Sequence, residues 1–324
     1  MTADAKTGLD RRPLGRSGIS IAPLVFGGNV FGWTADAATS YQLLDAFMEA
    51  GFNAIDTAEA YSSWVPGHTG GESETVIGDW LQRRGRRDHV VVCTKVGWHS
   101  GDKPGLLTAA NVARGCDASL KRLKTDYIDL YQSHSDDPQT PLEETLGAYA
   151  KLIEQGKVRA IGCSNYSAAR LKQALEISAR DGLPRYESVQ PPYNLHQREG
   201  FEAELQPLCL AEDVGVISYY ALASGFLSGK YRTEADKSKS VRGAGMHRFM
   251  DERGFRILAA LDQVAATHGV PPAQVAIAWI IARPGVTAPI ASATSLEQFR
   301  DLAAAARLQL SASDMAVLDK ASAW

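Results

Sequence analysis

The sequence alternates short apolar runs with longer amphipathic runs, and this alternation continues along nearly the whole chain. Several short runs are rich in β-branched residues, as the buried strands of a parallel sheet are. Eight such runs are present: Ala22–Gly28, Asn53–Asp56, Val90–Lys95, Tyr127–His134, Val158–Asn165, Glu187–Gln190, Gly215–Tyr220 and Thr287–Ser292. Between them lie helix-like runs that end on glycine, among them Thr39–Gly51, Ser73–Gly85 and Thr140–Gly156. Eight strands alternating with helices predict an α/β fold, the (β/α)8 barrel.

Two further segments extend this barrel. The stretch "RPLGRSGISI" before the first strand predicts a β-hairpin that closes the bottom of the barrel. The stretch Ser228–Gly254, after the seventh strand, predicts a long polar loop, and such loops in compact domains are usually functional or disordered. No linker or low-complexity tract divides the chain, so we expect residues 1–324 to form one barrel domain.

Composition excludes several classes of function. The formal net charge of −3 gives no basic surface for nucleic acid or membrane. No apolar run approaches the length of about eighteen residues that a membrane span needs, and the polar N-terminus lacks the apolar core of a signal peptide. The four cysteines are far apart and form no CxxC motif, which indicates reduced thiols in a cytoplasmic protein. The seven histidines form no HxH or HExxH motif, so we expect no metal.

The predicted strands end on polar or ionisable side chains. In a barrel of this kind the active site lies at the C-terminal ends of the strands, so these side chains should meet at one face. They are Asp56, Lys95, His134, Ser164, Asn165, Gln190, Tyr219 and Tyr220. Taken singly, Asp56 fits a turn residue and His134 a buried core histidine; the predicted convergence of all these ends favours a site.

Three of these groups, together with Tyr61, suggest a reaction. Lys95 follows the apolar run "VVVCT" and needs a partner if its ammonium is buried, and Asp56 on the neighbouring strand provides one. Tyr61, five residues after Asp56, would lie beside this ammonium, which stabilises a phenolate and lowers the pKa of the hydroxyl. Tyr61 could then protonate a carbonyl oxygen that His134 orients, while a hydride attacks the carbonyl carbon.

These residues resemble the aldo-keto reductase family over nearly the whole chain. "GFNAIDTAEAY" is similar to the family segment with the catalytic Asp and Tyr, which correspond to Asp56 and Tyr61. Lys95 and His134 match the other two catalytic residues. The "SNY" and "LSGKY" segments look closest to the subgroup that includes potassium-channel β-subunits and bacterial general-purpose reductases.

The resemblance also implies a nicotinamide coenzyme. It places Ser164, Asn165 and Gln190 on the carboxamide, Tyr219 against the nicotinamide ring, and residues 222–230 around the pyrophosphate. The full set of implied coenzyme contacts is Gly28, Asn29, Ser164, Asn165, Gln190, Tyr219, Leu222, Ser224, Gly225, Lys230, Arg242, Thr294, Gln298 and Asp301.

The stretch "ASATSLEQFRD" departs from many NADP-binding members, because it has no Lys or Arg at or beside Ser295 and has Arg300 as its only nearby cation. Hydroxyls and a helix N-terminus can also hold a phosphate. We therefore expect a preference for NADP(H) with moderate selectivity over NAD(H).

The substrate is expected to be an aldehyde or ketone in an aromatic pocket formed by Trp33, Trp64, Trp98 and Tyr193. A coenzyme-binding regulatory module with little turnover stays an alternative, because the resemblance includes channel subunits. A Schiff-base aldolase using Lys95 is a weaker alternative, since a lysine paired with Asp56 stays protonated. A Rossmann dehydrogenase is disfavoured because "GGNVFG" does not match GxGxxG.

Overall fold

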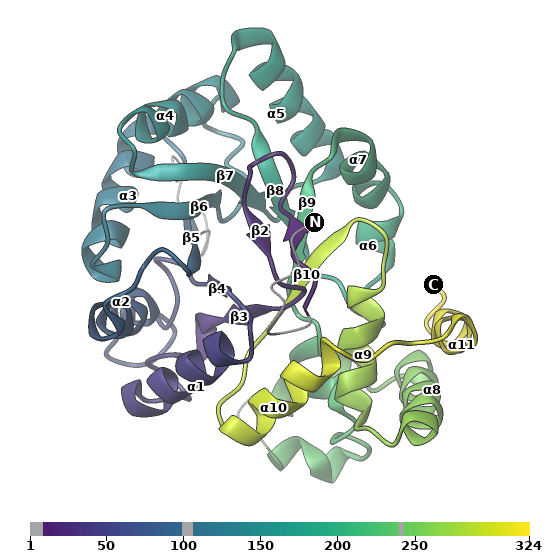
Figure 1. The fold of residues 1–324 in the computed structure, drawn as a ribbon. Coiled ribbons are helices and arrows are strands. Elements are labelled where there is room, and N and C mark those ends of the chain that lie inside the picture. Colours follow the sequence, from purple (N-terminus) through teal and green to yellow (C-terminus); the bar gives the residue numbers. More distant parts are fainter. Residues whose placement is uncertain (1–8, 99–105, 240–242) are drawn as a thin grey trace.

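Parallel strands close into a barrel at the centre of the computed structural model, which describes residues 9–98, 106–239 and 243–324 (Figure 1). Neighbouring strands follow the chain order around the ring, and the last strand, β10, pairs with both β3 and β9. The eight barrel strands of the described residues are β3 Val25–Gly27, β4 Ala54–Asp56, β5 Val91–Val96, β6 Ile128–Ser133, β7 Val158–Ser164, β8 Tyr186–Gln190, β9 Gly215–Ser218 and β10 Val286–Ala291. Each coincides with one predicted run to within a few residues, which confirms the predicted fold class.

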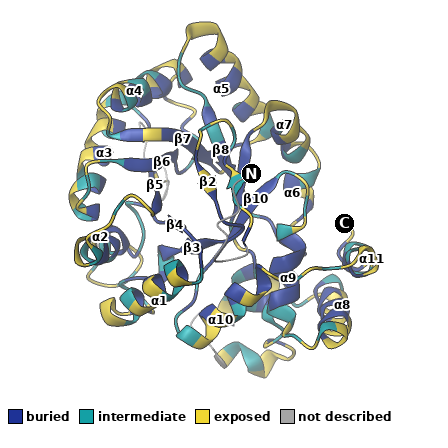
Figure 2. Ribbon diagram, viewed as in Figure 1, coloured by how far each residue is buried: buried dark blue, intermediate teal, exposed yellow. Residues whose placement is uncertain are grey.

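Helices surround the barrel, with their buried sides toward the strands and their exposed sides outward (Figure 2). Their bounds are α1 Ala37–Glu49, α2 Glu72–Arg84, α3 Ala109–Leu123, α4 Leu142–Glu154, α5 Ala168–Asp181, α6 Glu199–Glu202, α7 Leu205–Glu212, α8 Glu252–His268, α9 Pro272–Ile281, α10 Leu296–Ala305 and α11 Ala312–Ala321. Local signals in the sequence explain several ends. The Asp36 side chain accepts from the backbone N–H of Thr39 at the start of α1, and Gly85 ends α2 in the left-handed conformation (φ 67°).

The N-terminal hairpin seals one end of the barrel. Strands β1 Arg12–Pro13 and β2 Ser20–Ile21 pair antiparallel, as predicted. Leu14, Ile19 and Ile21 of this hairpin pack into the apolar cluster inside the barrel, where they meet residues such as Val25 and Leu130. The hairpin therefore closes the end at which the strands begin, and the site must lie at the other end.

The segment between β9 and α8 is not a plain loop. It contains the short 3-10 helices η2 Ala223–Ser228, η3 Glu234–Lys239 and η4 Gly243–Arg248, and α8 begins at Glu252, inside the predicted loop range. A further 3-10 helix, η1 Gly28–Val30, follows β3.

In the part of the chain that the structure describes, no single helix is long and apolar enough to cross a membrane. The bent pair α8 and α9 satisfies that test only when the two helices are joined across their 95° bend.

Candidate active site

A buried ion pair forms the centre of the site. Asp56 is the last residue of β4 and Lys95 lies near the end of β5, so the parallel pairing of these strands brings both to the same end of the barrel. Lys95 Nζ lies 2.6 Å from Asp56 Oδ2 and also donates to the carbonyl oxygen of Thr57 at 2.8 Å. The Asp56 side chain is 0 % exposed and that of Lys95 is 1 % exposed. The predicted partnership of these two residues is thus present in the structure.

Tyr61 completes a triangle with this pair. The segment after β4 turns back at Ala58, whose carbonyl accepts from the backbone N–H of Tyr61 at 3.1 Å. The turn places the Tyr61 hydroxyl 2.9 Å from Lys95 Nζ and 3.1 Å from Asp56 Oδ2. The five-residue spacing in the sequence therefore returns the phenol to the ion pair.

The pKa of Tyr61 differs from the sequence-based expectation. Burial raises the pKa of this hydroxyl well above its ordinary value, and the Asp56 charge and hydrogen bond raise it further. Lys95 opposes this rise, because a nearby ammonium favours the phenolate, but a net lowering of the pKa was the wrong prediction. Tyr61 therefore carries its proton at neutral pH, as a proton donor must.

His134 follows β6 and lies beside the phenol. Its backbone N–H donates to the carbonyl of Val96 at 2.8 Å, and its ring centroid lies 6.0 Å from that of Tyr61. Burial, and then the Lys95 charge, hold the pKa of His134 well below its usual value, so the ring is neutral at neutral pH. Its buried Nδ1 has no hydrogen-bond partner among the described residues.

The predicted carboxamide contacts also converge at this end of the barrel. Ser164 Oγ donates to the carbonyl of Gln190 at 2.8 Å, and Asn165 Nδ2 donates to the carbonyl of His134 at 2.9 Å. The Tyr219 hydroxyl donates to Asn165 Oδ1 at 2.7 Å. Gln190 lies deeper and donates from Nε2 to Asp56 Oδ1 at 2.9 Å. The structure thus links these residues to one another and to the ion pair.

The predicted pyrophosphate segment has a strained backbone. Ala223, Ser224 and Gly225 have φ values of 46°, 58° and 100°, and positive φ is unusual for the first two residue types. Leu222 precedes them, and Lys230 lies close by, since a Cβ added to Gly225 would be 3.6 Å from Lys230 Nζ. Such turns present backbone N–H groups and suit an anion.

Arg248 of η4 is a residue that sequence reasoning missed, although its loop was singled out. Its Nη2 donates to Ser224 Oγ at 3.2 Å and adds a cation to this turn. The expected phosphate contact Arg242 lies outside the described residues.

The remaining predicted coenzyme contacts lie after β3 and β10. Gly28 and Asn29 are in η1, and Asn29 Oδ1 accepts from Ser292 Oγ at 2.7 Å, which joins these two strand ends. Thr294 donates from its backbone N–H to Gln298 Oε1 at 2.9 Å at the start of α10. Asp301, one turn further along α10, accepts from Gln274 at 3.0 Å.

Three of the four predicted pocket aromatics lie around Tyr61 and His134. Trp64 packs against Tyr61 at 6.1 Å between ring centroids and against Trp33 at 5.6 Å, and Trp98 lies 4.5 Å from His134. Trp64 and Trp98 are 48 % and 44 % exposed, so both present open ring surface beside the phenol.

Tyr193 is the exception. It is fully buried, packs against Phe201 and Trp279, and donates its hydroxyl proton to Glu202 at 2.5 Å. Its hydroxyl finds a partner within the core, so its placement in the substrate pocket is corrected.

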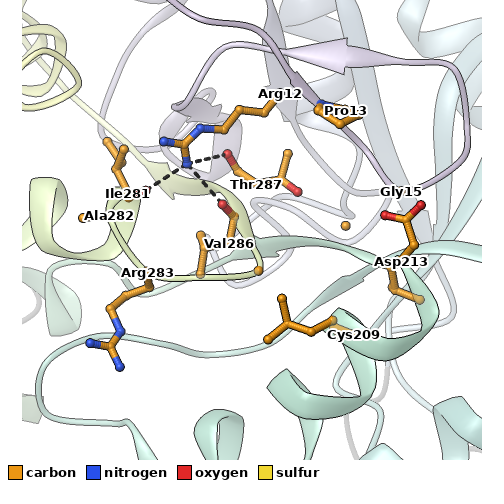
Figure 3. A pocket seen from close by; sticks show the side chains of 14 residues that line it. Arg12, Pro13, Gly15, Cys209, Asp213, Ile281, Ala282, Arg283, Val286 and Thr287 are labelled. Atoms are coloured by element: carbon orange, nitrogen blue, oxygen red, sulfur yellow. Dashed lines mark hydrogen bonds between the residues drawn. The ribbon is translucent and has the colours of Figure 1, made fainter.

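A hollow of about 450 Å³ lies at the opposite end of the barrel (Figure 3). It is bordered by the hairpin and by the first residues of β9 and β10. Arg12 occupies one side and donates to the carbonyls of Ile281, Val286 and Thr287. Burial raises the pKa of the Cys209 thiol in its wall to about 12, so this thiol is uncharged and unreactive.

None of the predicted site residues borders this hollow. Among the described residues no group of three His, Cys, Asp or Glu side chains is arranged to hold a metal ion.

Comparisons with known proteins show the family of the chain. The chain is 31% identical to the protein tas of Escherichia coli, with 94% of each chain covered. It is 32% identical to a probable voltage-gated potassium channel subunit beta of Arabidopsis thaliana, over 89% of this chain and 88% of that protein. It is 33% identical to the aldo-keto reductase YhdN of Bacillus subtilis, over 88% and 82% of the two chains. The sequence model of the Aldo/keto reductase family matches residues 23–323. The chain therefore belongs to the aldo/keto reductase family.

Proposed function

We propose that this protein reduces aldehydes or ketones to alcohols with a reduced nicotinamide coenzyme, and that Tyr61 donates the proton. The observation that carries the proposal is the triangle of Tyr61, Lys95 and Asp56, with hydroxyl distances of 2.9 and 3.1 Å, beside a neutral His134. Membership of the family supports an oxidoreductase with a nicotinamide coenzyme. The small-molecule substrate, its carbonyl group and the direction of reaction are our inference.

The side chains divide the work between them. The bound coenzyme supplies the hydride. His134 donates a hydrogen bond from its ring N–H that orients the carbonyl oxygen near Tyr61. Tyr61 transfers its proton to that oxygen as negative charge develops there. The Lys95 ammonium stabilises the phenolate that remains, and Asp56 keeps this ammonium in place.

The residues present fit a dinucleotide. Asn165, Gln190 and Ser164 offer amide and hydroxyl groups for a carboxamide, and the positive-φ turn at Ser224 suits a pyrophosphate with Lys230 and Arg248 beside it. Ser295 caps α10 and accepts from the N–H of Gln298, so this helix N-terminus can receive a 2′-phosphate. We propose a preference for NADP(H) over NAD(H).

Localisation in the cytoplasm is part of the same proposal. It is supported by the four buried, unpaired cysteines, since a reducing compartment keeps thiols free.

A regulatory role is a second candidate, because a relative with 32% identity is described as a probable channel subunit beta. Such a module would bind the coenzyme but turn over carbonyl compounds very slowly. The aldolase alternative has less support. Burial lowers the pKa of Lys95, but the 2.6 Å contact with Asp56 opposes this shift and stabilises the ammonium, which is a poor nucleophile.

The Tyr61→Phe variant tests the proposal. It removes the proton donor, so carbonyl reduction should fall by about 10²–10⁴-fold, while coenzyme binding measured by fluorescence stays close to wild type. Tyr127→Phe is a matched control, because Tyr127 precedes β6 at the other end of the barrel.

Three outcomes separate the candidates. Retention of most of the rate in Tyr61→Phe would refute the role of Tyr61. Coenzyme binding without turnover in the wild type, over a panel of aldehydes and ketones, would favour the regulatory candidate. Trapping of a substrate on Lys95 by borohydride would favour the aldolase.

A further inference from the structure

The far side of the Asp56 carboxylate is held by two glutamines. Lys95 and Tyr61 use only Oδ2 of this group. Oδ1 accepts from Gln190 Nε2 at 2.9 Å and from Gln132 Nε2 at 3.5 Å. The carboxylate is fully buried, so these amides replace the water that would otherwise solvate Oδ1.

The two amides also contact each other. Gln190 Nε2 lies 3.5 Å from Gln132 Oε1, so the side chains of β8 and β6 meet across the barrel interior in front of β7. The residue of β7 at this level is Gly162, and any side chain there would collide with its neighbours. A Cβ on Gly162 would lie 2.4 Å from Ser188 Oγ and 3.2 Å from Gln132 Cγ. The glycine of "IGCSN" therefore makes room for Ser188 and for the side chain of Gln132.

The Oε1 atom of Gln190 is available as a hydrogen-bond acceptor. Its Nε2 hydrogens serve Asp56 and Gln132, and no described residue donates to its Oε1. That oxygen can accept from an amide while the nitrogen stays on Asp56. A ligand amide on Oε1 would polarise the glutamine and strengthen its donation to Asp56.

We propose that Gln132 and Gln190 are positioning residues that hold and partly neutralise the Asp56 carboxylate, and that Gln190 connects coenzyme binding to the proton donor Tyr61. The proposal rests on the proposed function for the identity of the ligand amide, the coenzyme carboxamide. The contacts among Asp56, Gln132 and Gln190 do not depend on it.

The charge on Asp56 determines the direction in which the pKa of Tyr61 should change when a glutamine is replaced. This charge raises the pKa of Tyr61, so withdrawal of one N–H donor from Asp56 should raise it further. A higher pKa makes Tyr61 a weaker acid, so proton transfer to the substrate should slow. Loss of the Tyr61 proton at alkaline pH should lower the rate, and this alkaline limb of the pH–rate profile should move to higher pH in the variant. The other titratable groups that influence this cluster are Cys93, Lys95, Glu74, His134, Tyr219 and Tyr220.

Gln132→Met is the sharpest test, because methionine has nearly the same length and no amide. Gln132 has no assigned contact with the coenzyme, so coenzyme affinity and KM should stay within about twofold. The loss of a hydrogen bond to a charged group should lower kcat by about tenfold and shift the alkaline limb upward. Ser188→Ala is the matched control: its hydroxyl lies in the same layer, is buried and has no partner among the described residues. It should leave the profile unchanged.

A second measurement does not need turnover. Tyrosine labelled with ¹³C at Cζ reports the state of each phenol, and Tyr61→Phe identifies the Tyr61 signal. Gln132→Met should move this signal and raise the pH at which it titrates, whereas Ser188→Ala should not. If Gln132→Met does not fold, Gln132→Asn withdraws the amide by one methylene and should change both readouts in the same direction.

The outcomes separate the two proposals. An unchanged pH profile and an unchanged Tyr61 signal in a folded Gln132 variant would overturn the positioning role. Absence of carbonyl reduction in the wild type would refute the proposed function alone, and the Tyr61 signal would then decide about Gln132. Coenzyme addition should move the Tyr61 signal in the wild type and move it less in Gln190→Met; equal movement would overturn the connection through Gln190.

Discussion

Replacement of Lys95 by methionine should destabilise the fold strongly, because it leaves a buried carboxylate without its cation. The pair is separated by 2.6 Å, and its side chains are 0 % and 1 % exposed. Removal of one partner from such a pair typically costs about 3–5 kcal/mol. Tyr61 and Gln190 still donate to Asp56 in the variant, so we expect the loss near the lower end of that range, about 3 kcal/mol.

A second variant separates the cost of the unpaired Asp56 charge from the cost of lost side-chain packing. The double variant Asp56→Asn/Lys95→Met removes both charges and should recover much of the stability that Lys95→Met loses. The unfolding free energies of the wild type, Lys95→Met, Asp56→Asn and the double variant form a double-mutant cycle.

Chemical unfolding followed by far-ultraviolet circular dichroism measures all four proteins under one set of conditions. The single variants should not sum to the double variant, because the two residues share one interaction. A Lys95→Met loss below about 1 kcal/mol would refute the reasoning, since surface pairs have that value. Additive free energies in the cycle would refute it as well.

Three further predictions follow from the site. Burial holds the pKa of His134 well below its usual value, so the unfolded chain binds a proton below about pH 6.5 that the folded chain does not. The free energy of unfolding should therefore fall as pH decreases below about 6.5, by up to about 1.4 kcal/mol per pH unit from this residue. In His134→Gln the free energy of unfolding should depend less on pH than in the wild type. Equal pH dependence in the two proteins would contradict a lowered pKa for His134. Arg248→Gln should weaken binding of reduced coenzyme by about tenfold at low salt and less at high salt, because the guanidinium beside Ser224 is exposed and salt screens its attraction for a phosphate. Stopped-flow or equilibrium fluorescence with Arg256→Gln as the control would check this. Titration of wild-type fluorescence with both reduced coenzymes should give the lower Kd for NADPH, and a lower Kd for NADH would reject the proposed preference.

The strand pattern predicted the fold and the convergence of Asp56, Lys95 and His134, because parallel strands in a barrel end at one face. The run Val90–Lys95 became β5 Val91–Val96, for example, and the pairing with β4 then brings Lys95 to Asp56. The strand pattern predicted the order of residues along each strand and the common direction of the strands.

Features that depend on loop paths were not predictable in the same way. Tyr193 looked like a pocket residue, but Glu202, nine residues on, reaches back to its hydroxyl in the core. Arg248 reaches Ser224 only because η4 folds against the turn after β9. Neither contact follows from hydrophobic period or from the end of a strand.

Gln132 was missed although a signal was present. It lies two residues after Leu130, which packs inside the barrel, so period-two alternation places it on the same inner face. An amide among inward apolar residues requires a buried partner, and the question of that partner leads to Asp56.

The interior of the barrel explains why such partners matter. Beneath Asp56 lies a cluster of apolar side chains and Cys93, and the hairpin residues Leu14 and Ile21 pack at its far end. Asp56 and Lys95 are buried, so each charge must be balanced by a fixed group. Lys95, Tyr61 and the two glutamines do this in four directions, so the carboxylate is held in one orientation before any ligand binds. Fixed donors in a dry interior need no rearrangement when charge develops during proton transfer. The apolar barrel is therefore part of the proposed proton-donating device, because it allows small changes at Asp56 to reach Tyr61 without being screened by solvent.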